Sequence, residues 1–368
     1  MPRGDISLHD IRKAPLRDLR PHHDQVGILS AESLRQEARR QIRCGDVRTA
    51  VIYLEALHLV RPSLDTTLEL ATLYRQCQLY TDGLELLRHS HELWPSRTDL
   101  ISMQAEFAML AKAYEQAAAL WLRLIGHTGK LARYPLLRAI ACFRQLQQED
   151  AAQELIARYA SDLSRMLTAS AFEHLQHGLR GPIGVEKGLY MITGNNGTGK
   201  TTVGQWLQAL GVMIVDADIE IAAFCDGRRW AILRYDLSLG SPESEANIDW
   251  IWPRERFERA CAESRVSERA VFVIGGFGAT VMPYVQCARR VFHLTAPTKV
   301  IAHRLAGRGS PAHRVGSAGY NAALRRNAGE AQPRYPAQII SAEGSVWQSC
   351  AAILDGLGVR IAPQARRV

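Results

Sequence analysis

One stretch of the sequence carries a complete motif for gripping phosphate. The pattern G-x-x-x-x-G-K-[ST] is matched by Gly194-Asn195-Asn196-Gly197-Thr198-Gly199-Lys200-Thr201, between an apolar run and a helix-like segment that starts at Thr202. Glycines let backbone N–H groups converge on phosphate oxygens, and the amino terminus of a helix adds its positive dipole. We expect Lys200 to reach the β- and γ-phosphates and Thr201 to ligate Mg²⁺. Gly194 to Thr202 therefore predict a nucleoside triphosphate site.

Two carboxylates follow the next apolar run along the chain. Met213–Val215 is typical of a strand, and Asp216 and Asp218 come at its end. Ligands of open parallel sheets bind at that edge. Residues spaced by two point the same way from an extended strand, so one of the two aspartates can meet a metal while its neighbour meets a substrate hydroxyl. The alternative is an acidic strand end that only faces solvent.

Further candidates follow later strands. Gly275 and Gly276 come directly after Val271–Ile274, where glycines would let backbone N–H groups approach a ligand, although a tight turn would also use them. Three arginines come after the next strand, at Arg304, Arg308 and Arg314. Such arginines could neutralise the charge of a transferring phosphate, or they could be ordinary surface residues.

The elements that must position these residues alternate between strands and helices. Short apolar runs bounded by glycine are found at Leu189–Thr193, Met213–Val215, Val271–Ile274, Val291–Leu294 and Gln338–Ile340. Helix-like segments separate them, and Thr202–Leu210 is one of these. The alternation predicts a parallel sheet wrapped by helices over residues 187–368.

The amino-terminal half has a longer period. Small residues recur every 33 or 34 positions, and a second small residue follows each by twelve. The pairs are Ala38 and Ala50, Ala71 and Gly83, Ala105 and Ala117, and Ala139 and Ala151. Paired helices cross closely where side chains are small, and the pattern resembles four tetratricopeptide repeats over residues 31–165. Such arrays present a groove for a peptide or partner protein, or stack against a neighbouring domain; both interpretations stay open.

The chain as a whole is therefore predicted to be a multidomain α + α/β protein. A flexible segment over residues 1–30 would precede the helical-repeat solenoid, and residues 166–186, with Gly181-Pro182, would connect it to the sheet-containing domain. Basic residues are scattered without a run of five, which argues against nucleic acid, and an anionic substrate explains the formal charge of +8 as well as nucleic acid would. No apolar stretch is long enough for a membrane, and seven cysteines without a C-x-x-C pair indicate reduced thiols in the cytoplasm.

Over roughly residues 186–360 the sequence resembles the small-molecule kinases of the shikimate kinase and nucleoside monophosphate kinase superfamily. Its segments come in the order of that family: G-N-N-G-T-G-K-T-T-V-G, D-A-D-I-E-I, the glycine cluster, and V-F-H-L-T-A-P with R-L-A-G-R. Residues 335–341 and 345–357 resemble the family's last strand and helix. The resemblance implies a P-loop α/β kinase domain with ATP and Mg²⁺ as cofactors and a small-molecule acceptor.

The same resemblance implies a role for each candidate residue. Asp216 would lie near Mg²⁺, Asp218 would contact the acceptor hydroxyl, and Gly275 and Gly276 would line the acceptor pocket. The arginines Arg304, Arg308 and Arg314 would belong to a lid. Phe277 interrupts the glycine run of shikimate kinases, and the family's Arg-Pro pair is absent, so the acceptor stays open. Arg254 and Arg256 are candidates for holding an acceptor carboxylate.

The sequence thus favours an ATP-dependent phosphotransferase. Lys200, Thr201 with its metal, and arginines such as Arg304 and Arg308 would stabilise the transferring group, while Asp218 orients the acceptor. The main alternative is an NTPase switch whose nucleotide state changes what the repeats bind. A toxin-like kinase of nucleotide sugars would use the same site, and a scaffold that only binds nucleotide is a further hypothesis.

Overall fold

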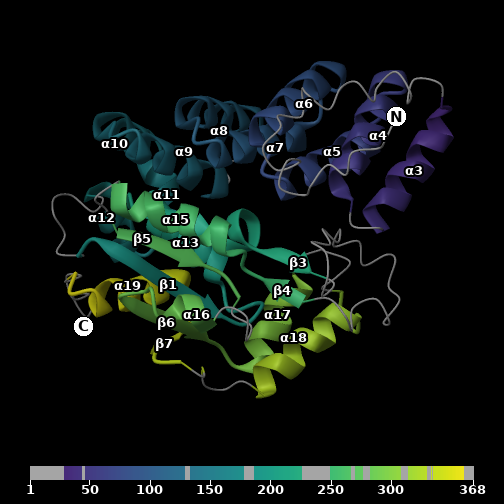
Figure 1. The fold of residues 1–368 in the computed structure, drawn as a ribbon. Helices are drawn as coiled ribbons and strands as arrows, with labels where there is room; N and C mark the ends of the chain where they lie inside the picture. Colours follow the sequence, from purple (N-terminus) through teal and green to yellow (C-terminus); the bar gives the residue numbers. More distant parts are fainter. Residues whose placement is uncertain are drawn as a thin grey trace.

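The structure of the chain is a computed structural model. It describes residues 29–43, 46–128, 133–177, 186–225, 249–266, 270–276, 282–307, 314–329, 333 and 335–359. Figure 1 shows an array of helices from the amino-terminal half lying over a sheet-containing carboxy-terminal part. Within the described ranges, no helix combines the length and the apolar composition that crossing a bilayer requires.

The amino-terminal part consists of helical repeats, each made of two helices. In order they are α3 (Ala31–Arg43), α4 (Val47–Val60), α5 (Leu64–Gln76), α6 (Tyr80–Leu93), α7 (Thr98–Leu110), α8 (Tyr114–Thr128), α9 (Arg133–Gln145) and α10 (Glu149–Arg158). Each helix packs against the next one along the chain. The turns repeat as well, because Gln78, Lys112 and Gln147 all adopt positive φ, at 61°, 60° and 60°. The helical repeats expected from the sequence are present.

Small residues lie where the paired helices meet. The side chains of Ala38, Ala71, Ala105 and Ala139 are fully buried in the first helices. Ala50, Gly83 and Ala117 are buried in the second helices. The fourth repeat differs from the predicted register, since Ala152 is fully buried while Ala151 is half-buried. The cause is an extra residue, because α10 begins 35 residues after α8 instead of 34.

Two short helices continue the array into the predicted connector. They are α11 (Ala160–Met166) and α12 (Ala169–His177), and α12 buries Ala171 and Leu175. The first part of the connector is thus packed helix. Gly181 and Pro182 lie outside the described residues.

The carboxy-terminal part contains a five-stranded parallel sheet in the order β2-β5-β1-β6-β7. Its strands are β1 (Gly188–Gly194), β2 (Met213–Asp216), β5 (Ala270–Ile274), β6 (Arg290–Thr295) and β7 (Gln338–Ser341). These confirm the five predicted strands. A short antiparallel pair, β3 (Ala223–Cys225) and β4 (Asp249–Ile251), was not predicted.

Helices cover the sheet and connect its strands. They are α13 (Lys200–Ala209), α15 (Arg254–Val266), α16 (Met282–Val285), α17 (Thr298–Ala306), α18 (Ala318–Gly329) and α19 (Val346–Gly356). One apolar cluster runs from the repeats across α13 to the sheet face of Tyr190 and Ile192. The opposite face, with Leu189 and Met191, has a separate cluster. On the α13 side, the repeats and the sheet therefore share one core.

The chain reverses direction across the sheet at β1. From β1 it passes through α13 to the edge strand β2, returns to β5 beside β1, and then crosses to β6 and β7 on the other side. Ligands of such sheets bind where the strand order reverses, outside the carboxyl ends of the strands. The carboxyl end of β1 is the segment that begins at Gly194.

Candidate functional site

The predicted phosphate loop connects β1 directly to α13. Gly194 ends the strand, Lys200 begins the helix, and Thr202 lies in its first turn. Gly197 and Gly199 have φ values of 88° and 95°, a conformation that side chains disfavour. A Cβ atom at Gly197 would also lie 2.9 Å from Cγ2 of Ile301. The glycines at these positions are therefore required by the shape of the loop.

Polar groups of the loop turn inward onto its own backbone. The ammonium of Lys200, which is 7% exposed, donates to the carbonyls of Gly194 at 2.7 Å and Asn195 at 3.0 Å. Thr198 also donates to the Asn195 carbonyl, from its hydroxyl at 2.8 Å and its amide at 3.2 Å. Asn196 is exposed at the tip. The loop is thus a closed ring with a cationic group held inside it.

The amino terminus of α13 opens onto this loop. Its first intrahelical bond runs from the Val203 amide to the Gly199 carbonyl, at 2.9 Å, and the N-cap residue Gly199 offers no side-chain cap. An α-helix leaves its first amides without intrahelical partners, and its dipole adds positive charge there. A cationic ring beside an uncapped helix terminus has the shape and charge to take a phosphate group.

Arg304 adds a second positive charge beside the loop. It lies on α17, and its guanidinium donates to the carbonyls of Thr198 and Gly344, both at 3.4 Å. Arg308 lies outside the described residues, and Arg314 is exposed. Among the three predicted arginines, the structure thus brings Arg304 to the phosphate loop.

The two predicted carboxylates do not share an extended strand. β2 ends at Asp216, and Asp218 belongs to the π-helical turn η2 (Ala217–Ile221). The prediction that both side chains point the same way from a strand was therefore wrong. The physical reason is local, because the Asp216 carboxylate accepts the Asp218 amide at 3.0 Å and so caps the turn.

A third carboxylate, Glu220, completes this turn and was not predicted. Its Oε1 accepts the amide of Asp216 at 2.9 Å. Burial, followed by the charges of Asp218 and Glu220, raises the pKa of Asp216 to about 7. Burial also raises the pKa of Glu220 to about 7, although the charges of Lys112 and Arg138 act in the other direction. A nearby cation would therefore stabilise the ionised form of these carboxylates.

Asp218 lies beside the glycines that follow β5. Its Oδ1 accepts the Gly276 amide at 3.4 Å. A Cβ atom at Gly275 would lie 2.8 Å from Ala217 Cβ, 3.2 Å from Trp252 Cζ2 and 3.3 Å from Asp218 Oδ1. Gly275 is therefore needed for close packing, and the structure brings Asp218, Gly275 and Gly276 together.

Arg254 lies apart from this group. Its side chain is 82% exposed and pairs with Glu258 on the same helix at 2.6 Å. No hydrogen bond or ion pair joins Arg254 to Asp218, Gly275 or Gly276 in the part of the chain that the structure describes.

A polar network at the carboxyl ends of β1 and β6 was not predicted from the sequence. The hydroxyl of Tyr335 contacts Thr193 Oγ1 at 2.9 Å and His293 Nδ1 at 3.3 Å. Burial, and then the charge of Lys200, lowers the pKa of His293. Thr193 and His293 pair across β1 and β6, but nothing in their spacing along the chain signals this.

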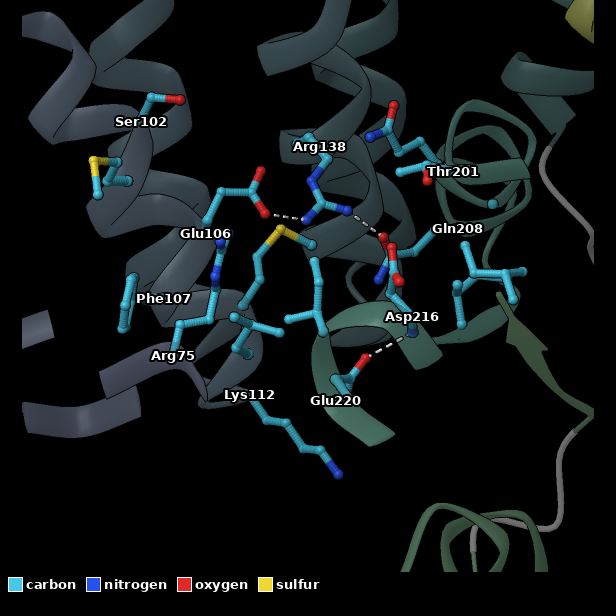
Figure 2. Close-up of a pocket in the computed structure, with 18 of the residues that line it drawn as sticks. Arg75, Ser102, Glu106, Phe107, Lys112, Arg138, Thr201, Gln208, Asp216 and Glu220 are labelled. Atoms are coloured by element: carbon cyan, nitrogen blue, oxygen red, sulfur yellow. Dashed lines mark hydrogen bonds and ion pairs between the residues drawn. The ribbon is translucent and has the colours of Figure 1, made fainter. Parts of the chain in front are cut away.

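Thr201 and Asp216, the predicted metal ligands, line one cavity of about 390 Å³ between the repeats and the sheet-containing part. Figure 2 shows Arg138 and Glu106 reaching into it from the repeats, with Thr201, Gln208 and Asp216 on the opposite side. Arg138 pairs with Glu106 at 2.7 Å and donates to Gln208 Oε1 at 2.6 Å. The repeats thus form a wall beside the start of α13, which carries Thr201.

Other contacts fix the repeats to α13 and η2. The guanidinium of Arg144, which is 3% exposed, donates to the carbonyls of Ala209 and Leu175 and pairs with Glu149. Gln78 donates to the carbonyl of Glu220. The helix that begins at the phosphate loop is therefore held by the repeats at its other end.

The described residues contain no group of three or more His, Cys, Asp and Glu side chains that could hold a metal alone. Mg²⁺ usually binds through one or two protein ligands together with substrate phosphates and water. Thr201 and Asp216, which line the same cavity, fit a metal of that kind.

No protein-family model matches the chain, and no curated protein matches its sequence.

Proposed function

We propose that the chain is an ATP-dependent phosphotransferase, a P-loop kinase that moves the γ-phosphoryl group of Mg·ATP to a small-molecule acceptor. The observation that carries this proposal is the glycine-shaped loop around the ammonium of Lys200, placed between the carboxyl end of β1 and the uncapped start of α13. A loop of that construction binds phosphate through backbone amides and a lysine.

In this proposal, each group acts by position and charge. Lys200 and Arg304, which contact the same loop, neutralise the charge of the transferring phosphoryl group. Thr201 and Asp216 would hold Mg²⁺, and the metal would supply positive charge for the phosphate oxygens. Transfer to an acceptor, in place of water, then depends on a group that holds the acceptor.

Asp218 is the residue proposed for that role. Unlike Asp216 it is exposed, and it faces the glycines Gly275 and Gly276 at the carboxyl edge of the sheet. It can accept the proton of an acceptor hydroxyl there without contacting the phosphate loop. Arg308, Arg314 and Arg254 stay proposed as lid and acceptor residues.

The test compares wild type with Asp218→Asn. We expect calorimetric Mg·ATP affinity to be unchanged, and acceptor-stimulated ADP formation to fall by about 100-fold or more, since a general base contributes about 10²–10⁴. The panel contains sugars, polyol acids and nucleotides. Glu92→Gln, a change of an exposed carboxylate on α6, is the matched control and should alter neither quantity.

Acceptor-independent ATP hydrolysis that survives Asp218→Asn would contradict the kinase proposal. It would favour the second candidate function, a P-loop NTPase switch in which nucleotide state controls what the tetratricopeptide-like repeats bind. The observation behind this candidate is the contact of Arg138 and Arg144 with α13, because that helix begins at the phosphate loop. A switch also predicts that Gln208→Ala changes nucleotide affinity, whereas the kinase proposal predicts an effect on stability alone.

A further inference from the structure

The cavity beside α13 extends well past the two predicted metal ligands. Its volume of about 390 Å³ lies within the range of pockets that hold small molecules, which is about 300–1,000 Å³. Residues from α5, α7 and α9 form one wall, and residues from α13, β2 and η2 form the other. The cavity exists only because the repeats dock on the sheet-containing part.

Part of its wall suits an aromatic or otherwise apolar molecule, while the carboxylates of Glu106, Asp216 and Glu220 line other parts of it. Three of the seven methionines of the chain line it, together with aromatic side chains. The apolar side chains that line it include Met103, Phe107, Met109, Tyr134, Met213 and Ile219. Methionine side chains are flexible and polarisable, so they adapt to a ligand's shape, and their sulfur atoms contact rings favourably.

One cationic side chain that lines the cavity makes no ion pair. Arg75 on α5 is an exposed residue, and its guanidinium makes no hydrogen bond or ion pair with any residue that the structure describes. Arg138, in the same cavity, is by contrast paired with Glu106 and Gln208. Figure 2 shows Arg75 on the repeat side, opposite Thr201 and Asp216. A guanidinium in this position is suited to a carboxylate, sulfonate or phosphate.

We propose that this cavity is a binding site for a small organic anion. The apolar body of the ligand lies against the methionines and rings, and its anionic group binds Arg75. Thr201, Gln205 and Gln208, spaced on one face of α13, form the far wall, so the ligand contacts the helix that begins at the phosphate loop. The cavity also contains Thr201 and Asp216, the residues proposed to hold Mg²⁺, but binding of the anion at Arg75 does not depend on phosphotransfer.

Two fluorescent probes of nearly the same shape test the site in the full chain. Anilinonaphthalene sulfonate carries an aromatic body and one anionic group, and phenylnaphthylamine carries the body alone. We expect both to bind wild type saturably. Arg75→Ala should weaken the sulfonate by about tenfold or more, since hydrogen bonds to charged groups contribute that much, and should leave phenylnaphthylamine unchanged. Arg158→Ala, an exposed arginine of α10, is the control and should change neither.

Two further variants locate the probes. Ser102→Phe fills the cavity and should abolish binding of both probes, with folding checked by circular dichroism and thermal unfolding. Lys200→Ala removes the phosphate site and should leave both affinities unchanged. Absence of saturable binding, equal effects of Arg75→Ala on the two probes, or loss of probe binding in Lys200→Ala would each overturn the proposal. If Ser102→Phe does not fold, the two-probe comparison on Arg75→Ala decides.

Discussion

The substitution Gly83→Ala tests how the repeat helices pack, because it adds only one methyl group. Gly83 lies in α6 and faces α7, and a Cβ atom added there would lie 2.0 Å from Cε1 and 2.5 Å from Cδ1 of Phe107. Phe107 is itself buried, at 3% exposed, so its ring has little room to move away. Gly83→Ala therefore forces a shift in the contact between two helices.

Two opposing effects decide the size of the change. Replacing glycine by alanine inside a helix favours folding by about 1 kcal/mol. Overpacking a well-packed contact costs about 1–3 kcal/mol, and the short distance to Phe107 places this contact near the upper value. We expect Gly83→Ala to lower the free energy of unfolding by about 2 kcal/mol.

Gly126 in α8 supplies the matched control. A Cβ atom there would have no neighbour within 4 Å. Gly126→Ala therefore raises helix propensity without a steric clash, and it should raise the free energy of unfolding by up to about 1 kcal/mol. Urea denaturation of the full chain, followed by circular dichroism, measures both. If Gly83→Ala stabilises the chain as much as Gly126→Ala does, the packing of α6 on α7 described above is wrong.

Two other perturbations probe the junction and the acidic turn. Arg144→Ala should destabilise the chain by about 2–3 kcal/mol, because it leaves the carbonyls of Ala209 and Leu175 without their donor. The loss is smaller than for a fully buried ion pair, because the partner carboxylate of Glu149 is 32% exposed and water can solvate it. Arg144→Lys should recover only part of this in urea denaturation, and full recovery would contradict the stated geometry. Asp216 and Glu220 have folded pKa values of about 7, above their ordinary values of 3.8 and 4.5. The stability that their protonated forms contribute is complete below about pH 4 and is lost as the pH rises to about 7. Without nucleotide and Mg²⁺, the urea midpoint should therefore fall less between pH 5 and pH 8 in Asp216→Asn than in wild type, and equal falls would contradict these shifts.

The strands and the glycine-rich loop between β1 and α13 could be predicted because their signals are local. Each strand is a short apolar run, and the loop motif spans only residues 194–201. The acidic turn also carried a local signal that was misread. An aspartate that ends a strand can cap a helical turn, and Asp216 caps η2 while Glu220 reaches back to its amide.

The junction between the two parts could not be predicted from local pattern. Its contacts join residues far apart in the sequence, such as Arg138 with Gln208 and Gln78 with Glu220. The cavity forms where the two parts dock, and the sequence periodicity within either part does not predict it. The one-residue change of register in the fourth repeat likewise became visible only from the burial of Ala152.

The most direct test of the central claim follows the γ-phosphate itself. The chain is incubated with γ-labelled Mg·ATP and the low-molecular-mass fraction of a cell extract, and the products are separated by chromatography. The phosphotransferase account predicts label on an organic small molecule with wild type and none with Lys200→Ala. Label that appears only as inorganic phosphate with wild type, or an organic product that Lys200→Ala still forms, would contradict it.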